Sequence, residues 1–103
     1  PCHCRLLEPA AQAFVAYLGS TEIKQPTIPV FSNVTVDLHR HPDDIRELLR
    51  QQLYSPVRWV ETIRRFKDEG ITDIIECGPG RVLTGLTKRI DRSLKALTIK
   101  EKI

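Results

Sequence analysis

The spacing of apolar residues near the start of the chain predicts an amphipathic helix over residues 9–18. Pro9 suits its first position, because the N–H that proline lacks would have no partner there. Gly19 supplies the stop, and a polar stretch with two prolines follows it. Apolar side chains recur on one stripe at a spacing of four, at Ala10, Phe14 and Leu18.

The next apolar positions favour a strand and then a second helix. Residues 28–31 and 34–36 are rich in β-branched and aromatic side chains, which predicts a short buried strand that ends near residues 32–33. Pro42 then begins a helix, because the two acidic residues that follow it would lie in the first turn and meet the positive end of the helix dipole. The inner face of this helix would carry Ile45, Leu48, Leu49 and Leu53.

A third helix is predicted directly after the second. Ser55 has the chemistry of an N-cap and Pro56 that of a first helical residue, while Gly70 marks the end. The two helices would therefore meet at a tight joint around Tyr54. Apolar residues at helical spacing define the inner face of the third helix: Trp59, Val60, Ile63 and Phe66.

The last third of the chain alternates strand, helix and strand. Residues 71–76 (ITDIIE) predict a short apolar strand that runs into a turn at residues 77–80 (CGPG). Helical spacing returns over residues 82–90, and a weaker strand is predicted over residues 96–99, before a charged tail. Strands separated by helices imply right-handed crossovers and a mostly parallel sheet covered by helices, so the predicted fold class is α/β.

Composition places the chain among small soluble domains. Its 103 residues are 41% hydrophobic and 28% charged, which is ordinary for a globular protein. No run approaches the roughly 18 apolar residues that a membrane helix needs, and no secretory signal lies near Pro1, so we expect a cytoplasmic protein without a membrane partner. The formal net charge of +3 favours an acidic partner. Basic residues are not interleaved with aromatic ones, so no nucleic acid is expected.

Two residue counts change this picture. The chain has no methionine, so Pro1 is not a translation start and we expect a piece of a longer polypeptide. Its three cysteines do not make a disulfide framework and are more natural as reduced thiols. Any function must therefore be inferred for the longer protein.

The sequence CHC at residues 2–4 raises the question of a metal site. Structural zinc sites usually separate their sulfur ligands by two to four residues so that the chain curls around the ion, and one intervening residue is tight. His39, His41 and Cys77 could complete such a site, although nothing in their spacing requires it. We therefore expect no bound metal, and the cysteines are better explained as small, half-buried side chains.

His3 is either a surface histidine or a catalytic base. A base needs a nucleophile within reach and a group that fixes its tautomer. If His3 is a base, its nucleophile lies outside this chain, because no serine of the chain stands in the nucleophile motif G-x-S-x-G. The serines are Ser20, Ser32, Ser55 and Ser93.

Two further features each have a structural and a functional explanation. The turn at residues 78–80 (GPG) lies where a helix N-terminus could hold a phosphate. It matches neither a dinucleotide motif nor a P-loop, so a tight strand-to-helix turn is the simpler interpretation. The basic residues on or after the last helix form either a solvated face or a docking surface for an acidic protein. They are Arg81, Lys88, Arg89, Arg92 and Lys95.

Four ordered stretches together resemble the C-terminal part of the bacterial malonyl-CoA:acyl carrier protein transacylases. They are PCHCRLLEPAA, IPVFSNVT, IRELLRQQLYSPVRWVETI and IIECGPGRVLTGLTKRI, and they cover almost the whole chain as far as Asp91. QLYSPVRW and GPGRVLTGLTKR are most similar to the stand-alone enzymes of type II fatty acid synthesis. The resemblance implies the C-terminal portion of an α/β-hydrolase-like acyltransferase core. Residues 1–103 would belong to its large subdomain, and the ferredoxin-like subdomain would lie elsewhere.

The resemblance implies a catalytic role for two residues. His3 falls on the family's catalytic base, and the main-chain carbonyl at the position of Gln52 would accept the imidazole N–H in place of a triad aspartate. Asn33 matches a recurrent residue near the family's site, with a structural or supporting role. The serine nucleophile in a G-H-S-x-G motif, the arginine that binds the malonate carboxylate and the oxyanion-hole donors would lie outside this chain.

By the same resemblance, the enzyme would transfer malonyl from coenzyme A to the phosphopantetheine thiol of acyl carrier protein by a ping-pong mechanism. Malonyl-CoA and phosphopantetheine would be substrates, so no cofactor is implied. The partners would be acyl carrier protein, malonyl-CoA and the rest of the same polypeptide, and the chain alone would be inactive without its nucleophile. The alternatives are an acyltransferase segment of a polyketide or type I fatty acid synthase, and a non-catalytic module that binds the carrier protein.

Overall fold

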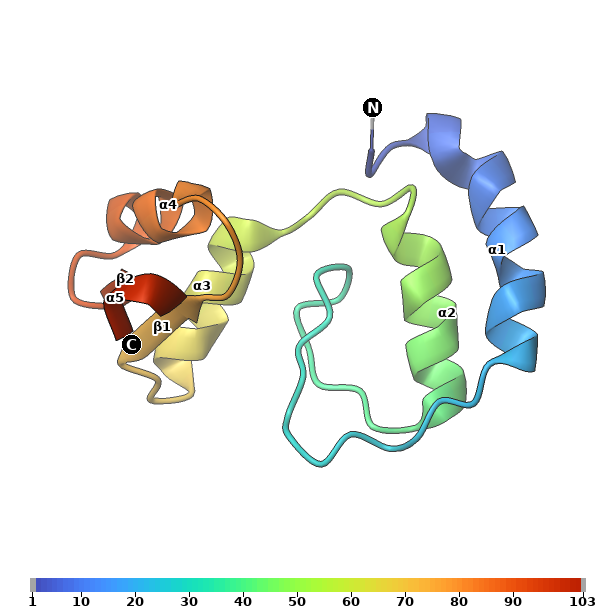
Figure 1. Cartoon of the computed structure of the whole chain (residues 1–103), viewed down its shortest axis with the longest axis horizontal. Helices are drawn as coiled ribbons and strands as arrows, with labels where there is room; N and C mark the ends of the chain where they lie inside the picture. The colour runs from blue at the N-terminus through green and yellow to red at the C-terminus, as the bar shows by residue number, and fades with distance from the viewer. Residues whose placement is uncertain (1, 103) are drawn as a thin grey trace. The chain divides into compact units, whose positions relative to one another are not determined.

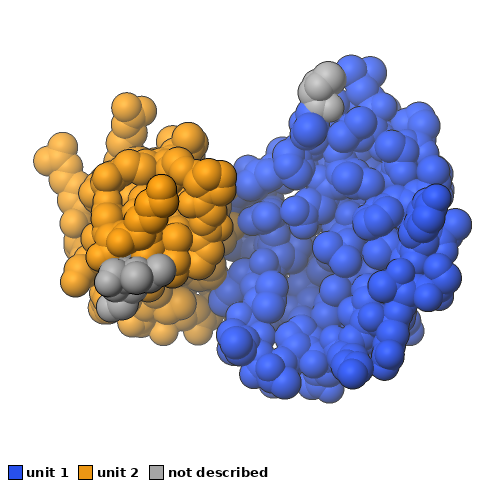
Figure 2. All heavy atoms as spheres, in the orientation of Figure 1, with its two compact units in different colours: residues 1–58 blue, residues 59–103 orange. Residues whose placement is uncertain are grey.

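The computed structural model describes residues 2–102, with only the backbone of Lys102, and the chain divides into two compact units (Figure 2). The first unit is Pro1–Arg58 and the second is Trp59–Ile103. Within the described residues, no helix has both the length and the apolar content needed to cross a bilayer.

A pair of packed helices forms much of the first unit. A short 3-10 turn, η1 (Arg5–Leu7), leads into α1 (Glu8–Ser20), and α2 (Pro42–Gln52) packs beside α1 (Figure 1). Both helices carry a proline in the first turn, as their sequences predicted. The helix predicted over residues 9–18 and the helix predicted to begin at Pro42 are therefore confirmed. The buried residues of α1 are Ala11 and Leu18.

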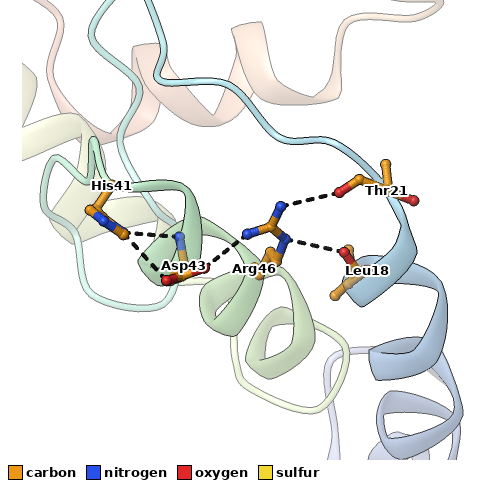
Figure 3. A network of polar contacts seen from close by, with 5 residues as sticks. All are labelled: Leu18, Thr21, His41, Asp43 and Arg46. Carbon is orange, nitrogen blue, oxygen red and sulfur yellow. Dashed lines mark hydrogen bonds and ion pairs between the residues drawn. The ribbon is translucent and has the colours of Figure 1, made fainter.

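One arginine of α2 closes the end of α1 (Figure 3). Arg46 donates from Nε to the Leu18 carbonyl (3.1 Å) and from Nη2 to the Thr21 carbonyl (3.2 Å). Its Nη1 also forms an ion pair with Asp43 (2.9 Å), whose own N–H donates to Nδ1 of His41 (3.2 Å). The last carbonyls of a helix have no partner within it. The guanidinium supplies that partner, and it links the end of α1 to the first turn of α2.

The strand predicted around residues 28–36 is wrong. This segment pairs through an isolated antiparallel bridge between Phe31 and Leu38, and no named strand forms there among the described residues. A strand needs a neighbour that satisfies its N–H and C=O groups along its length. Ile28 and Val30 remain 73% and 57% exposed, so two of the apolar side chains that predicted a buried strand are not covered, whereas Val36 is buried.

The second unit has an α/β arrangement. Strands β1 and β2 pair in parallel, in a register that runs from Asp73 opposite Lys95 to Glu76 opposite Thr98. Parallel strands need a crossover connection, and α4 supplies it, so the predicted α/β class with a parallel sheet is confirmed. The elements in chain order are α3 (Trp59–Asp68), β1 (Asp73–Glu76), α4 (Val82–Ile90), β2 (Lys95–Thr98) and α5 (Ile99–Lys102). The buried side chains are Thr62, Ile63, Thr84, Thr87, Leu94, Ala96 and Thr98.

The start predicted for the third helix is also wrong. α3 begins at Trp59 rather than at Ser55. The Ser55 N–H donates instead to the Gln51 carbonyl in the last turn of α2 (3.0 Å). Ser55 therefore bonds back to the preceding helix, and residues 53–58 form a non-helical connection between Gln52 and Trp59 in place of the tight joint predicted around Tyr54.

Candidate active site

His3 occupies a backbone conformation that side chains rarely adopt. Its φ is 58°, in the left-handed region, which costs a residue with a Cβ about 1 kcal/mol. Its main-chain N–H donates to the Leu53 carbonyl (3.1 Å). The next residue, Cys4, accepts the Leu7 N–H (3.0 Å) and so begins the turn η1. The backbone of His3 is thus held by α2 on one side and by η1 on the other.

The imidazole of His3 lies against a main-chain carbonyl. Its Nδ1 is 2.8 Å from the Gln52 oxygen. A carbonyl oxygen only accepts hydrogen bonds, so Nδ1 carries the proton, and in the neutral ring Nε2 has a lone pair with which it can take a proton. The structure therefore contains the contact that the resemblance implied between these two residues. The catalytic role of both stays a prediction.

The end of α2 explains why these carbonyls are available. Gln52 is the last residue of the helix and Leu53 is its C-cap. The last carbonyls of a helix have no partner within it, and His3 supplies a side-chain donor to one and a main-chain donor to the next. The helix end in return fixes the tautomer and orientation of the ring. Leu53 was not predicted as an acceptor for His3, because any residue can supply a main-chain carbonyl.

A cluster of polar side chains surrounds this helix end. Glu47 accepts hydrogen bonds from Nε (2.9 Å) and Nη2 (2.5 Å) of Arg50 and from Nε2 of Gln51 (2.8 Å). The Arg50 guanidinium lies over the Tyr54 ring, 5.5 Å from its centroid. The hydrogen bonds from Arg50 and then Gln51 lower the pKa of Glu47 to about 2, and the bond to Glu47 raises the pKa of Arg50. Sequence reasoning missed this cluster, whose signal was an acid and an arginine three residues apart on a helix.

Arg58 links a loop to the connection that follows α2. Its main-chain N–H donates to the Asn33 carbonyl (3.3 Å), and its Nη1 donates to the Val34 carbonyl (3.2 Å). Asn33 therefore lies in the same unit as His3 and Gln52 and is held there through its main chain. A supporting role for its side chain stays a prediction.

The cysteines beside His3 are not gathered with other metal ligands. Cys2 is exposed, Cys4 is half-buried, and both are free thiols. Among residues 2–102, no group of three or more His, Cys, Asp or Glu side chains is placed to hold a metal ion. His39, one of the residues that could have completed a site, has its Nε2 2.7 Å from the Thr35 hydroxyl instead.

A side chain of the protein itself occupies the N-terminus of α4. Glu76, the last residue of β1, accepts the Thr84 N–H (2.8 Å), the Thr84 hydroxyl (2.7 Å) and the Leu83 N–H (3.3 Å). These bonds, led by the Thr84 hydroxyl, lower the pKa of Glu76. Gly80 allows the chain to turn into the helix with a φ of 83°. The donors that could have held a phosphate are used internally, which supports the structural interpretation of this turn.

The basic residues near the end of the chain divide into two groups. Arg81 forms an ion pair with Glu101 (2.7 Å). The other four, which are exposed as Arg81 is, are Lys88, Arg89, Arg92 and Lys95. Three of them, all but Arg89, line an open hollow of about 470 Å³ beside the apolar residues of β2. This second group retains the two explanations given above, a solvated face or a docking surface.

The chain is similar over nearly its whole length to one group of enzymes. It is 44% identical over 101 residues to the malonyl CoA-acyl carrier protein transacylases of Haemophilus influenzae and of Bacillus subtilis, with 98% of the chain covered in each case. A crystal structure of an acyl carrier protein S-malonyltransferase from Vibrio cholerae matches 96% of the chain with a TM-score of 0.93 and 44% identity. The chain is homologous to part of the malonyl CoA-acyl carrier protein transacylases. No family model matches it.

The chain matches only part of the length of these transacylases. The chain spans about a third of their length, 32% of each of the two relatives and of the Vibrio cholerae structure. The resemblance found in the sequence is confirmed, and the α/β fold is that of the matching part of the S-malonyltransferases. A further solved relative, 44% identical with a TM-score of 0.93 over 96% of the chain and 32% of its own, is a malonyl-transacylase in complex with a type II polyketide acyl carrier protein.

Proposed function

We propose that the protein containing this chain transfers malonyl from coenzyme A to the phosphopantetheine thiol of an acyl carrier protein in type II fatty acid synthesis, with His3 as general base and acid. The observation that carries the proposal is the 2.8 Å contact between Nδ1 of His3 and the Gln52 carbonyl. This contact keeps the lone pair of Nε2 for proton transfer. Homology to the malonyl CoA-acyl carrier protein transacylases supports the choice of substrates. The proposed reaction needs no resident cofactor, because malonyl-CoA and phosphopantetheine are substrates.

Both halves of the reaction use the same proton shuttle. In the first half, Nε2 of His3 takes the proton from a serine hydroxyl outside these 103 residues, the serine oxygen attacks the thioester carbonyl, and the carbon–sulfur bond breaks. The imidazolium then protonates the departing thiolate of coenzyme A. In the second half, the thiol of the carrier protein gives its proton to His3 and attacks the serine ester. The released serine oxygen takes that proton back, and the Gln52 carbonyl accepts the Nδ1–H bond throughout.

The test uses the full-length protein that contains this chain. Given malonyl-CoA that is labelled in the malonyl group, the wild-type protein should become labelled and pass the label to acyl carrier protein. His3→Ala should lower kcat by about 10³-fold or more, because the members of such a catalytic unit act together. Transfer by His3→Ala at close to the wild-type rate would exclude His3 as the base, and an unlabelled wild-type protein would exclude the transacylase reaction.

We also propose that the exposed basic residues of the second unit bind the acyl carrier protein. Support comes from the open hollow between Lys88, Arg92 and Lys95, whose positive charge suits an acidic partner. Changing Lys88 and Arg92 to glutamate in the full-length protein should raise KM for the carrier protein about tenfold at low ionic strength. KM for malonyl-CoA should not change. An unchanged KM for the carrier protein would overturn this docking surface.

A further inference from the structure

We infer that Arg50 is a positioning residue for His3: together with Glu47 and Tyr54, it fixes the last turn of α2, whose carbonyls orient the imidazole. The inference rests on the proposed role of His3 as the base. Arg50 acts through the main chain of α2 and through no contact with a reacting atom.

The orientation of His3 depends on two consecutive peptide groups. The Gln52 carbonyl accepts the bond from the imidazole (2.8 Å), and the Leu53 carbonyl accepts the bond from the main-chain N–H of the same histidine (3.1 Å). Rotation of either peptide plane would move an acceptor away from its donor. It would also release the left-handed turn that His3 holds at a φ of 58°. Whatever holds the residues on either side of these peptide groups therefore also holds the imidazole.

The cluster around Glu47 holds both of those flanking residues. Before the two peptide groups, the Gln51 side chain donates to Glu47 (2.8 Å). After them, the Tyr54 ring lies under the Arg50 guanidinium at 5.5 Å. Glu47 joins the two sides, because it holds Arg50 through two N–H groups, at 2.9 and 2.5 Å. This planar fork is a geometry that lysine does not reproduce.

The exposed fractions of the Glu47–Arg50 ion pair favour a role in orienting residues over a role in stabilising the fold. The Arg50 side chain is 20% exposed, but that of Glu47 is 50% exposed, and so exposed an ion pair adds little to the stability of a fold. The pKa of Glu47 is lowered to about 2, chiefly by the hydrogen bond from Arg50, so this hydrogen bond favours the ionised carboxylate. A cation held over a ring selects one orientation of that ring, and here the ring belongs to Tyr54, directly after Leu53.

The chain offers a matched control in the other unit. Arg65 on α3 and Glu69, the residue directly after the end of α3, form an ion pair of the same kind (2.8 Å), with side chains 35% and 47% exposed. In the full-length protein, Arg50→Met should lower kcat about tenfold with KM for malonyl-CoA unchanged, because a small displacement of a catalytic group slows the reaction steeply. Arg50→Lys should lie between Arg50→Met and wild type, since it keeps the charge and loses the fork. Arg65→Met should have the wild-type kcat.

Nitrogen-15 NMR of the histidine rings reports the tautomer of His3, which would not change if Arg50 only stabilised the fold. The signal of His3, assigned by its absence from His3→Ala, should come mostly from the Nδ1-protonated tautomer in wild type and in Arg65→Met. Arg50→Met should gain the Nε2-protonated tautomer. Wild-type ring shifts together with wild-type kcat in Arg50→Met would overturn the inference. A wild-type protein with this tautomer but without transacylase activity would overturn the proposed function alone, because the ring still reports on Arg50.

Tyr54 provides a second pair of variants in case Arg50→Met fails to fold. Tyr54→Phe keeps an aromatic face under the guanidinium, whereas Tyr54→Leu removes it. The leucine variant should lose more kcat than the phenylalanine variant and should show more of the Nε2-protonated tautomer of His3. Equal kcat and equal ring shifts in the two variants would overturn the inference.

Discussion

The end of α2 and the start of α4 are each closed by a titratable side chain from another segment. At the end of α2, His3 uses one ring nitrogen to donate to the Gln52 carbonyl. At the start of α4, Glu76 accepts the Leu83 N–H at Oε1 and the Thr84 N–H and hydroxyl at Oε2. The imidazole keeps its second nitrogen, whereas the carboxylate has a hydrogen bond at each of its oxygens.

This difference separates a structural cap from a site that can react. Both helix ends fix the orientation of the side chain that closes them, and a catalytic group needs such fixing. A base also needs a proton affinity suited to its task, and the lowered pKa of Glu76 means that its hydrogen bonds favour the ionised form and weaken it as a base. A ring with two nitrogens on different sides lets His3 bind the helix end and still exchange a proton.

The largest expected effect comes from His3→Asn, which keeps a side-chain donor for the end of α2 and removes the ring nitrogen that would act as the base. Asparagine tolerates the left-handed φ of residue 3, and its amide group can donate to the Gln52 carbonyl, but it has no atom in the place of Nε2. We expect His3→Asn in the full-length protein to lose about 10³-fold or more in kcat. Its Tm should stay closer to wild type than the Tm of His3→Ala. Steady-state kinetics measures the loss of kcat, and thermal unfolding measures the two Tm values.

The expected Tm and the expected kcat of His3→Asn can each be contradicted separately. Equal losses of Tm in His3→Asn and His3→Ala would mean that the end of α2 gains nothing from a side-chain donor at residue 3. Activity of His3→Asn near that of wild type would remove the ring from the mechanism and leave His3 as a cap, like Glu76.

The next effect concerns the stability of α4. Glu76→Ala takes the acceptor away from the N–H groups of Leu83 and Thr84, so Tm should fall by a few degrees, as for the loss of a helix N-cap. Glu76→Gln keeps one acceptor oxygen, so its Tm should fall about half as far. Thermal unfolding followed by circular dichroism measures both, and a wild-type Tm in Glu76→Ala would show that the cap contributes nothing.

A smaller effect should appear in acid. The pKa of Glu76 is lowered from the ordinary value of 4.5, mainly by the Thr84 hydroxyl, so its stabilisation is fully present above pH 4.5 and is lost as the pH falls through the lowered value. Below pH 4.5, the Tm of wild type should therefore fall more steeply than the Tm of Glu76→Gln, which has no carboxylate to protonate at this position. Parallel curves of Tm against pH for the two proteins would contradict the role of the ionised carboxylate.

The helices could be predicted because neighbouring residues determine them, and the parallel strand pair could be predicted from the alternation of strands and helices along the chain. Prolines in the first turns and apolar residues at regular spacing lie within each element, so α1, α2 and β1 were all expected. The strand expected around residues 28–36 failed because β-branched side chains express a preference for pairing and do not encode the partner. The early start expected for α3 was wrong: the helix begins at Trp59, and the Ser55 N–H bonds to the last turn of α2.

The candidate site was harder to predict from residue patterns than the fold. His3 and Gln52 were named through a resemblance, since the group that meets the imidazole is a main-chain carbonyl, which any residue could supply. Leu53 was missed for the same reason. The spacing of Glu47 and Arg50 was visible, but pairs at this spacing are common on exposed helix faces, and the place of the Tyr54 ring depends on the turn that follows α2.

The smallest expected effect tests whether the group that orients His3 belongs to the main chain. Gln52→Ala keeps the carbonyl oxygen that accepts the Nδ1–H bond, and alanine is a strong helix former, so kcat should fall by at most about threefold, far less than in His3→Asn. The Gln52 side chain is half-buried and lines an apolar pocket of about 240 Å³, so a small fall in Tm is the main result we expect. A loss of kcat as large as that of His3→Asn would place the side-chain amide in the mechanism. The end of α2 would then resemble the start of α4, where side-chain chemistry makes the contact, and the distinction between the two helix ends would fail.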